Sequence, residues 1–570
     1  MKNIHRFLPY LSTLVVFVSA WLFFGLVYPN HIHFHEQYQM FVYDSDYLSD
    51  ILSRPGGLAD LVGRFLTQFF LYEWGGSCIL AALLAAVQCW TARRLGWSKA
   101  AAFSLLPAVL LFGAFCEENT MVGSLVAILL SQITSAVIGG IRQESLRAAL
   151  SVVLTPILYW LVGPLAVLYV LTVRVSVWAL ITNVVILLVW PGLCQQWVSM
   201  SLDNLYLSTH YYRHPGIVPV LLWIATGVMI VLDRLPDWLK GWTRTEPTLP
   251  LPLAGIVIVS ALGGGFVAHS SNMKAEEVMQ YDFLARHQNW NGIIQAANTK
   301  APNNFISVTA LNLALGMKGQ LGERLFDYHQ NGLQGLLPRF DRDPVSPLTT
   351  SEVFYHLGMI NTAQRFVFEA QEAIPDYQKS ARCYKRLAET NLINGSYDVA
   401  RKYLLVLRKT LYYRRWAERT LALLGHEEAI VNHPEYGHLR QVRMKEDFYF
   451  SDQETSQMLG QLLLSNPRNR LAFEYLESSY LLSKNLDSFV QCLGYGNALN
   501  YSRMPRCFDQ GILLWWSRDH KASEKMPFSV SPDLVSRMHS FYTMMQAQNR
   551  DSERIKASFG QTYWYYYFFN

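Results

Sequence analysis

The hydropathy of the chain changes once, near His269. Long apolar runs follow one another before this position, whereas residues 270–570 are polar and amphipathic and contain no apolar run of membrane length. Hydrophobic residues make up 51% of the 570-residue chain and charged residues only 16%, which argues against a wholly soluble protein. We therefore predict an all-α protein with a membrane part over residues 1–268 and a water-soluble part over residues 269–570.

About nine apolar runs are predicted to cross the membrane as helices. The first run, residues 7–28, follows Lys2 and Arg6, but it is too long for a signal peptide and has no Ala-x-Ala exit, so we interpret it as a retained anchor. The run 163–173 is too short to cross alone; with 175–194 it forms either a broken pair or one tilted helix plus a re-entrant turn. The other predicted spans are residues 75–90, 100–115, 121–139, 146–162, 217–232 and 251–268.

Basic residues between the runs predict the orientation of the spans. They cluster near the N-terminus and in alternate loops, at residues 93–99, 142–147 and 234–244. The positive-inside rule places these loops and the N-terminus in the cytoplasm, and residues 269–570 on the other side of a bacterial inner (plasma) membrane. The net charge of +5 comes without a concentrated basic face, which argues against binding to nucleic acid.

The soluble part has the spacing of paired helices. Small residues recur at intervals that resemble the tetratricopeptide repeat, in which they allow two antiparallel helices to touch: Gly358, Ala363 and Ala370 before Pro375, and then Gly395 and Ala400. A solenoid of this kind offers a concave face to a protein or peptide partner; the alternative is a rigid helical lid on the membrane part. The aromatic run 563–570 is expected to dock on the last helix pair or at the membrane interface.

The first predicted outer loop is rich in polar residues. His31, His33 and His35 would align on one side of an extended segment, where they could bind a transition metal or simply lie at the membrane interface; we assign no metal to them. Residues 58–72 are too polar for a comfortable span and suit a helix in the interface. We therefore predict that residues 29–74 form an outer loop followed by an interfacial helix.

Several acidic and basic residues are candidates for chemistry on the same side. Asp44 and Asp46 could ligate a hard divalent cation or supply a general base, although acidic pairs in a solvated loop usually do neither. Arg213 and His214 could bind a phosphate, or close a loop before Pro215. The pair Glu117-Glu118 is predicted to lie at the same level.

Taken together, the acidic first loop, the interfacial helix, Glu117-Glu118 and the outer helical tail resemble the C-type glycosyltransferases. The run from Phe41 to Asp46 is similar to the acidic loop of that superfamily, although Ser45 interrupts the acids and the later spans show no matching motif. The resemblance implies a polyprenyl-phosphate sugar donor; we assign no cofactor, and a divalent cation belongs only to the enzyme alternative. It also implies Asp44 or Asp46 as the catalytic acid or base or as a metal-proximal residue, with Glu117 and Glu118 as further catalytic candidates and Arg213 and His214 at the lipid phosphate.

The chain resembles more closely a group of bacterial polytopic membrane proteins of unassigned function. They share a repeat-like tail, a His-Glu-Gln loop (residues 35–37) and a Pro-Gly-Gly turn (residues 55–57). We carry forward a membrane protein whose outer helical repeats bind an envelope protein or peptide, for interaction or envelope assembly. The alternative is the glycosyltransferase, and whether the protein is an enzyme stays open. A transporter is a weaker alternative, because Arg174 is nearly the only ionisable residue within the spans.

Overall fold

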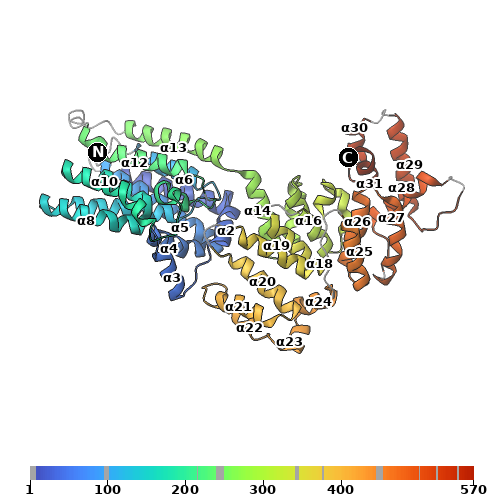
Figure 1. Ribbon diagram of the computed structural model, residues 1–570. Helices are drawn as coiled ribbons and strands as arrows, with labels where there is room; N and C mark the ends of the chain where they lie inside the picture. Colours follow the sequence, from blue (N-terminus) through green and yellow to red (C-terminus); the bar gives the residue numbers. More distant parts are fainter. Residues whose placement is uncertain are drawn as a thin grey trace. The chain divides into compact units, whose positions relative to one another are not determined.

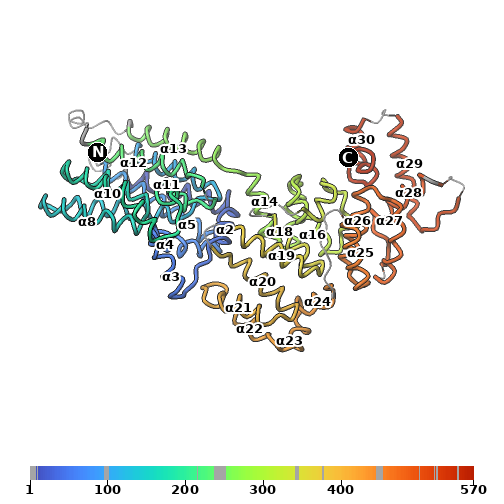
Figure 2. Tube along the Cα trace, in the orientation of Figure 1, coloured from blue at the N-terminus to red at the C-terminus, as the bar shows by residue number. Residues whose placement is uncertain are grey.

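In the computed structural model every named element is a helix, over the residues that the structure describes: 8–95, 102–214, 216–238, 250–339, 346–374, 378–444, 454–499, 501–520, 524–547 and 551–570 (Figure 1). The chain divides into two compact units. Unit 1 contains Met1–Glu276, Ile374–Arg382 and Val406–Arg415, and unit 2 contains Glu277–Ala373, Cys383–Leu405 and Trp416–Asn570. Figure 2 follows the chain through both units. Parts of two predicted basic loops, residues 96–101 and 239–249, lie outside the described residues.

Unit 1 contains helices that are long and apolar enough to cross a membrane, as expected for a membrane protein. Among the described residues there are five: Tyr10–Val27, Glu73–Leu95, Glu144–Thr172, Val177–Cys194 and Pro252–Ser270. The third includes α8 (Glu144–Val162), the 3₁₀ turn η5 (Gly163–Leu165) and α9 (Ala166–Thr172), which the sequence suggested as separate runs. The helices α6 (Leu105–Ala114) and α7 (Gly123–Gly139) are apolar but shorter. The total of nine spans stays a prediction.

The helices of unit 1 pack against one another, and two of them meet at glycines. Helix α1 (Leu8–Leu22) packs along α5 (Glu73–Leu95), while α6 contacts both α12 (Val220–Trp238) and α13 (Pro250–Ser270) (Figure 1). Helix α4 (Gly57–Thr67) crosses α7 where Gly63 meets Gly123; a Cβ atom on Gly63 would lie 2.5 Å from the Gly123 nitrogen. Only glycine permits so close an approach of two helices. The other long helix of the bundle is α10 (Val177–Cys194).

Short helices occupy the region predicted as the first outer loop. Helix α1 continues into the π-helical turn η2 (Phe23–Val27) and then, from Pro29, into α2 (Pro29–Tyr38). Next come α3 (Ser45–Leu52), α4 and the 3₁₀ turn η3 (Gln68–Leu71), so the helix predicted over residues 58–72 is present; its location at a membrane interface stays a prediction. Helix α11 (Leu202–Leu207) and the 3₁₀ turn η6 (Thr209–Tyr211) come later in the same unit, and the first stretch of unit 1 ends within α14 (Met273–Arg286).

Unit 2 consists of short helices, many in antiparallel pairs. Helix α18 (Ser346–Leu357) turns at Gly358 into α19 (Ile360–Glu372), and α20 (Ala381–Asn394) turns at Gly395 into α21 (Tyr397–Arg408). Both glycines have a positive φ, 94° and 81°, which side-chain-bearing residues rarely adopt. Ala363 and Ala400 are fully buried, as the small-residue spacing predicted. The assignment to the tetratricopeptide class stays a prediction.

Four of the remaining helices of unit 2 are capped at their N-terminus by an asparagine. Asparagine side chains accept a hydrogen bond from the third helical N–H at four helix starts: Asn289, Asn304, Asn469 and Asn485. The helices not yet given are α15 (Trp290–Thr299), α16 (Phe305–Met317), α17 (Leu321–Arg324), α22 (Arg414–Leu421), α23 (Glu427–Val431), α24 (Pro434–Val442), α25 (Thr455–Ser465), α26 (Arg470–Leu482), α27 (Leu486–Cys492), α28 (Arg506–Asp519), α29 (Pro532–Ala547), α30 (Ser552–Phe559) and α31 (Tyr563–Phe569), with 3₁₀ turns η7 (Leu325–Asp327), η8 (Gly332–Gly335) and η9 (Leu493–Leu499).

A buried ionic network joins α18 to α20 inside unit 2. The Arg386 guanidinium is paired with the Glu352 carboxylate and donates to Glu389 Oε2 at 2.9 Å, and it lies 3.6 Å from the centre of the Tyr355 ring. Burial disfavours the charge on Arg386, but the surrounding carboxylates outweigh it, and the pKa of Arg386 is raised. Buried charges of this kind are tolerated only with complete pairing, so the network favours one specific arrangement of the two helices.

The aromatic C-terminal run docks on unit 2, one of the two expected positions. It forms α31, whose Tyr563 N–H donates to Gln510 Oε1 at 2.8 Å and whose Trp564 Nε1–H donates to the Gln510 carbonyl at 3.0 Å. Gln510 belongs to α28, and the Trp564 ring is fully buried. The run therefore completes the core of unit 2.

Truncation of the buried ring at Trp564 should destabilise unit 2. We expect Trp564→Ala to lower the free energy of unfolding by about 3–5 kcal/mol, because it leaves a cavity and removes the bond to Gln510. Phe568 on the same helix is partly exposed and provides the matched control; Phe568→Ala should cost about 1 kcal/mol or less. Urea unfolding of the detergent-solubilised protein measures both. Equal effects of the two variants would contradict the docking of α31.

Candidate functional site

Two stretches of the predicted soluble part belong to unit 1, where they contact the first polar region of the chain. We call residues 378–382 and 409–413 the docking segments. The Met40 N–H donates to the Lys379 carbonyl at 2.9 Å, and the Tyr43 N–H donates to the Lys409 carbonyl at 2.8 Å. Each docking segment is thus fixed by a main-chain hydrogen bond to the stretch that follows α2.

Side chains reinforce both docking segments. The buried Arg382 donates from Nη1 to Gln37 Oε1 at 2.9 Å, and Tyr413 donates from its hydroxyl to Glu36 Oε1 at 3.1 Å. The Tyr412 ring packs edge-on against Tyr72, with ring centres 5.5 Å apart. Polar groups of α2 that would otherwise be buried without partners are satisfied by residues far along the chain.

The predicted acids of the first loop lie at the start of α3. Asp44 is half-buried, and its Oδ2 atom accepts a hydrogen bond from Lys409 Nζ at 2.8 Å. Asp46 lies in the first turn of α3 and is exposed. Asp44 therefore binds a docking segment, a partner that sequence spacing could not reveal because 365 residues separate it from Lys409.

The structure does bring Glu117, Glu118 and Arg213 together. The loop after α6 pairs with residues 211–213, because the Met121 N–H donates to the Tyr211 carbonyl at 3.0 Å and the Arg213 N–H donates to the Asn119 carbonyl at 2.9 Å. The Tyr212 hydroxyl bonds to the exposed Glu117 carboxylate. Glu118 lies close enough to Arg213 to favour its charged form.

Arg213 is enclosed beneath α2. Its guanidinium carbon lies 4.0 Å from the centre of the Tyr38 ring and 4.7 Å from that of Phe34, and the residue is only 5% exposed. Burial lowers the pKa of Arg213 to about 10, so it stays cationic at neutral pH. Contacts with aromatic faces stabilise such a desolvated cation by about 2 kcal/mol. His214 follows on the same segment, half-buried, with its ring 6.3 Å from that of Tyr212.

The prediction that His31, His33 and His35 share one side of an extended segment is wrong, because Pro29 starts a helix here. His31 and His35 lie one turn apart with their Nε2 atoms 3.1 Å from each other, whereas His33 Nδ1 lies 3.2 Å from the Phe70 carbonyl. Burial lowers the pKa of His31 to about 3 and that of His35 well below its usual range, so both rings are neutral. Within the described residues no three His, Cys, Asp or Glu side chains are grouped to hold a metal ion.

Helix α2 is wholly buried from His31 to Tyr38 and lacks a side-chain cap of its own. Glu276 of α14 supplies the cap: its Oε1 atom accepts from the Asn30 N–H at 2.8 Å, and its Oε2 atom accepts from the His31 N–H at 3.0 Å. Burial raises the pKa of Glu276 to about 7, although these hydrogen bonds oppose the shift. A carboxylate at a helix N-terminus also complements the helix dipole.

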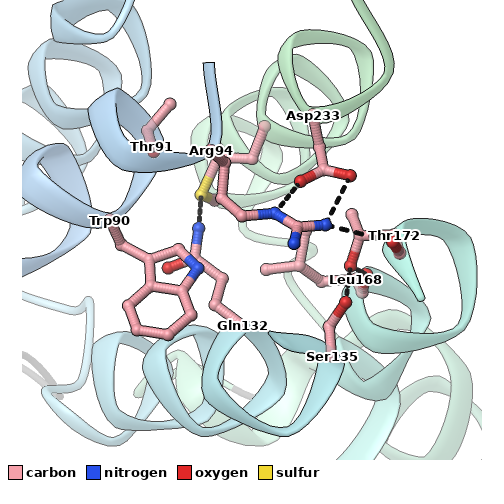
Figure 3. A pocket seen from close by; sticks show the side chains of 9 residues that line it. Trp90, Thr91, Arg94, Gln132, Ser135, Leu168, Thr172 and Asp233 are labelled. Atoms are coloured by element: carbon pink, nitrogen blue, oxygen red, sulfur yellow. Dashed lines mark hydrogen bonds and ion pairs between the residues drawn. The ribbon is translucent and has the colours of Figure 1, made fainter. Parts of the chain in front are cut away.

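A second polar site lies inside the helix bundle of unit 1 (Figure 3). Arg94 of α5 pairs with Asp233 of α12, with 3.1 Å between Nη2 and Oδ2, and also donates to the Thr172 carbonyl at 3.4 Å. The nearby Gln132 donates to Met229, while its buried Oε1 atom has no partner among the described residues. The cavity here measures about 10 Å³, enough for a single water molecule. The sequence pattern places Arg94 in a basic cluster and gives no sign of its pairing with Asp233.

The fold and these sites define an all-helical protein that has several helices long and apolar enough to cross a membrane and a second helical unit. The chain belongs to a family of unknown function, DUF6057, whose sequence profile matches residues 3–570. No curated protein and no solved structure matches the chain.

Among the cations of the docking segments, the buried Arg382 should matter more than the exposed Lys409. We expect Arg382→Met to speed amide exchange in residues 36–44 by about 10-fold or more. The substitution removes the donor of a buried, charged hydrogen bond and leaves the Gln37 Oε1 atom without that donor. Lys409→Met is the matched control; Lys409 is exposed, and its ion pair is worth about 1 kcal/mol or less. Hydrogen exchange measured by mass spectrometry tests both variants. A larger effect from Lys409→Met would refute this ranking.

Breaking the ion pair within the bundle should be costly, and removing both charges much less so. Asp233→Asn leaves the Arg94 charge without its counter-ion, and we expect a loss of about 3 kcal/mol in the free energy of unfolding. The double variant Arg94→Met, Asp233→Met should recover most of this loss. Denaturation in detergent measures both, and a double variant no more stable than Asp233→Asn would show that the pair itself stabilises the bundle.

Proposed function

We propose that this is a membrane-anchored interaction protein: unit 2 binds a polypeptide of the cell envelope, and unit 1 anchors it in the bilayer. The observation that carries the proposal is the way the chain alternates between the units. It passes from one to the other at five points, after Glu276, Ala373, Arg382, Leu405 and Arg415. A module on a single flexible linker would need only one such point. Because the docking segments belong to unit 1, the chain connects unit 2 to unit 1 at several points instead of one.

Unit 2 has the internal order that a binding surface requires. Its buried Arg386 network and its docked C-terminal helix specify one packing of its helices, and paired short helices offer extended surfaces for polypeptides. Preorganised surfaces bind with less loss of conformational entropy than flexible ones. The placement of unit 2 on the extracytoplasmic side rests on the distribution of basic residues in the loops and is part of this proposal.

The geometry of the acidic residues supports interaction better than group transfer. A transferase of the C-type class needs catalytic acids and a lipid-phosphate cation around one open space. Asp44 is bonded to Lys409, and Arg213 is enclosed by the rings of Phe34 and Tyr38. These two residues thus have structural partners in the positions where the transferase would need them free.

Site-specific photo-crosslinking in intact cells tests the proposal with the full-length protein. A photoreactive phenylalanine analogue is placed at Leu464 in unit 2, and at Leu188 on the candidate span α10 as the matched control; the two leucines are 65% and 62% exposed. Leu464, and the exposed Phe368 and Val431, should give adducts with one and the same envelope polypeptide, identified by mass spectrometry. The Leu188 position should react with lipid. If no unit 2 position gives a polypeptide adduct, the proposal fails.

A membrane glycosyltransferase is the second candidate, favoured by one observation, namely that Glu118 and Glu117 lie on the loop that pairs with the Arg213 segment. The variants Asp44→Asn and Glu118→Gln separate the two candidates. A transferase that used these acids should lose envelope glycan in both variants at unchanged protein level. An interaction protein should leave the glycan profile intact.

A further inference from the structure

A polar cavity of about 80 Å³ lies in unit 1 beside the Pro55-Gly56-Gly57 turn, and Gln378 of a docking segment contributes to its lining. Its lining includes Arg54, Asp60, Arg64, Asn204 and His210. Gly56 adopts φ +82° at the start of α4, and a Cβ atom there would lie 2.6 Å from His210 Nε2. The turn therefore brings bare backbone against the histidine ring, which a side chain would not allow.

The cavity carries a net positive charge. Arg64 binds Asp60 with two hydrogen bonds, from Nε to Oδ1 at 2.9 Å and from Nη2 to Oδ2 at 2.8 Å. Arg54 lies at 4.0 Å from the same carboxylate, beyond hydrogen-bond distance, and its buried Nε atom has no partner among the described residues. Burial favours neutral Asp60, but Arg64 and Arg54 outweigh it, so its pKa is lowered. Two guanidinium groups thus share one carboxylate, and Arg54 has donors left for an anion.

His210 contributes a lone pair instead of a charge. Its Nδ1 atom lies 3.2 Å from the Asn204 carbonyl, which can only accept, so the proton is on Nδ1. Burial lowers the pKa of His210 to about 4, although Asp60 opposes the shift, and the ring is neutral at physiological pH. Its Nε2 atom is therefore an acceptor, is buried, and has no partner within the described part of the chain.

An acceptor beside cationic donors selects a particular kind of anion. The ligand must accept hydrogen bonds from Arg54 and donate one to His210 Nε2, so it must carry negative oxygens and a proton. Sulfate and phosphate diesters have no such proton at neutral pH, whereas inorganic phosphate retains one and phosphate monoesters do so below about pH 6. A volume of about 80 Å³ is several times the roughly 10–15 Å³ that one water molecule needs, and it admits one phosphate group, with any ester substituent directed outwards.

We propose that this cavity binds a protonated phosphate group, either free phosphate or the head of a phosphate monoester lipid, through Arg54 and His210. Arg54 donates to the anionic oxygens, and the P–OH proton is donated to His210 Nε2. Arg64 keeps Asp60 ionised and oriented. The inference is independent of the function proposed for unit 2, because every residue named here belongs to unit 1.

Titration calorimetry on the intact detergent-solubilised protein at about pH 6 tests the inference without any variant. Inorganic phosphate should bind at least about 10-fold more tightly than sulfate, because sulfate leaves the buried Nε2 atom unsatisfied. Vesicles that contain phosphatidic acid, a monoester lipid, are compared with vesicles that contain phosphatidylglycerol, a diester. Selective binding of phosphatidic acid would identify the lipid head as the ligand, and binding of inorganic phosphate alone would identify the free ion. Equal affinity for phosphate and sulfate, or no binding of either phosphate source, overturns the proposal.

Two variants assign the roles within the cavity. Arg54→Met should weaken phosphate and sulfate alike by about 10-fold or more, whereas His210→Phe, which keeps a ring but removes the acceptor nitrogen, should abolish the preference for phosphate. Arg142→Met, at an exposed arginine outside the cavity, is the control and should bind as the unmodified protein does. A cooperative melting transition verifies that each variant is folded. Unchanged phosphate affinity in folded Arg54→Met would rule out this site.

Discussion

Unit 1 depends on partners for the polar groups of a helix that is buried along most of its length. From His31 to Tyr38, α2 is buried, and water cannot satisfy its histidines, its glutamate, its glutamine or its first N–H groups. An unsatisfied buried group costs about 1–3 kcal/mol, so several of them would exceed the usual stability margin of a folded unit. The partners come from distant sequence: Glu276 at the start of the helix, and Arg382 and Tyr413 near its end.

This requirement explains why the predicted soluble part of the chain returns to the membrane unit. Lys379 and Lys409 offer main-chain carbonyls to the stretch that follows α2, and Arg382 offers its guanidinium to Gln37. The same stretch places Asp44 against Lys409. A loop that resembles the acidic loop of a transferase is, in this fold, an attachment point for the docking segments.

The features that follow from local physics could be predicted from the sequence. Apolar length indicated the helices of unit 1, and small-residue spacing at Gly358, Ala363, Gly395 and Ala400 indicated the helix pairs of unit 2. The approach of Glu117-Glu118 to Arg213 followed from neither signal; it was expected only from the shared level of two predicted loops. The extended conformation predicted for His31–His35 was wrong. Pro29 and the distant Glu276 stabilise a helix here, although the composition of the segment is typical of a loop.

The partners of Asp44, Arg94 and His210 were beyond prediction for a common reason. Lys409 and Asp233 lie far along the chain from Asp44 and Arg94. The Asn204 carbonyl lies near His210 in the sequence, but it fixes the tautomer of His210 only once the fold brings the two together. Charge bias identified Arg94 as a loop residue because Arg93, Arg94 and Lys99 form a basic cluster at the end of an apolar run. Only tertiary packing distinguishes that arrangement from a buried pair.

The alternation of the chain between its units has a consequence for inheritance. Residues 374–382 and 406–415 belong to unit 1, yet the segment between them belongs to unit 2. No single cut in the gene separates the two units, and neither could have been gained or lost by a fusion at one end. A recombination event that kept only the membrane helices would also discard the residues that satisfy Gln37 and Glu36. The two halves are expected to be inherited as one piece, with changes on either side of His269 compensated on the other.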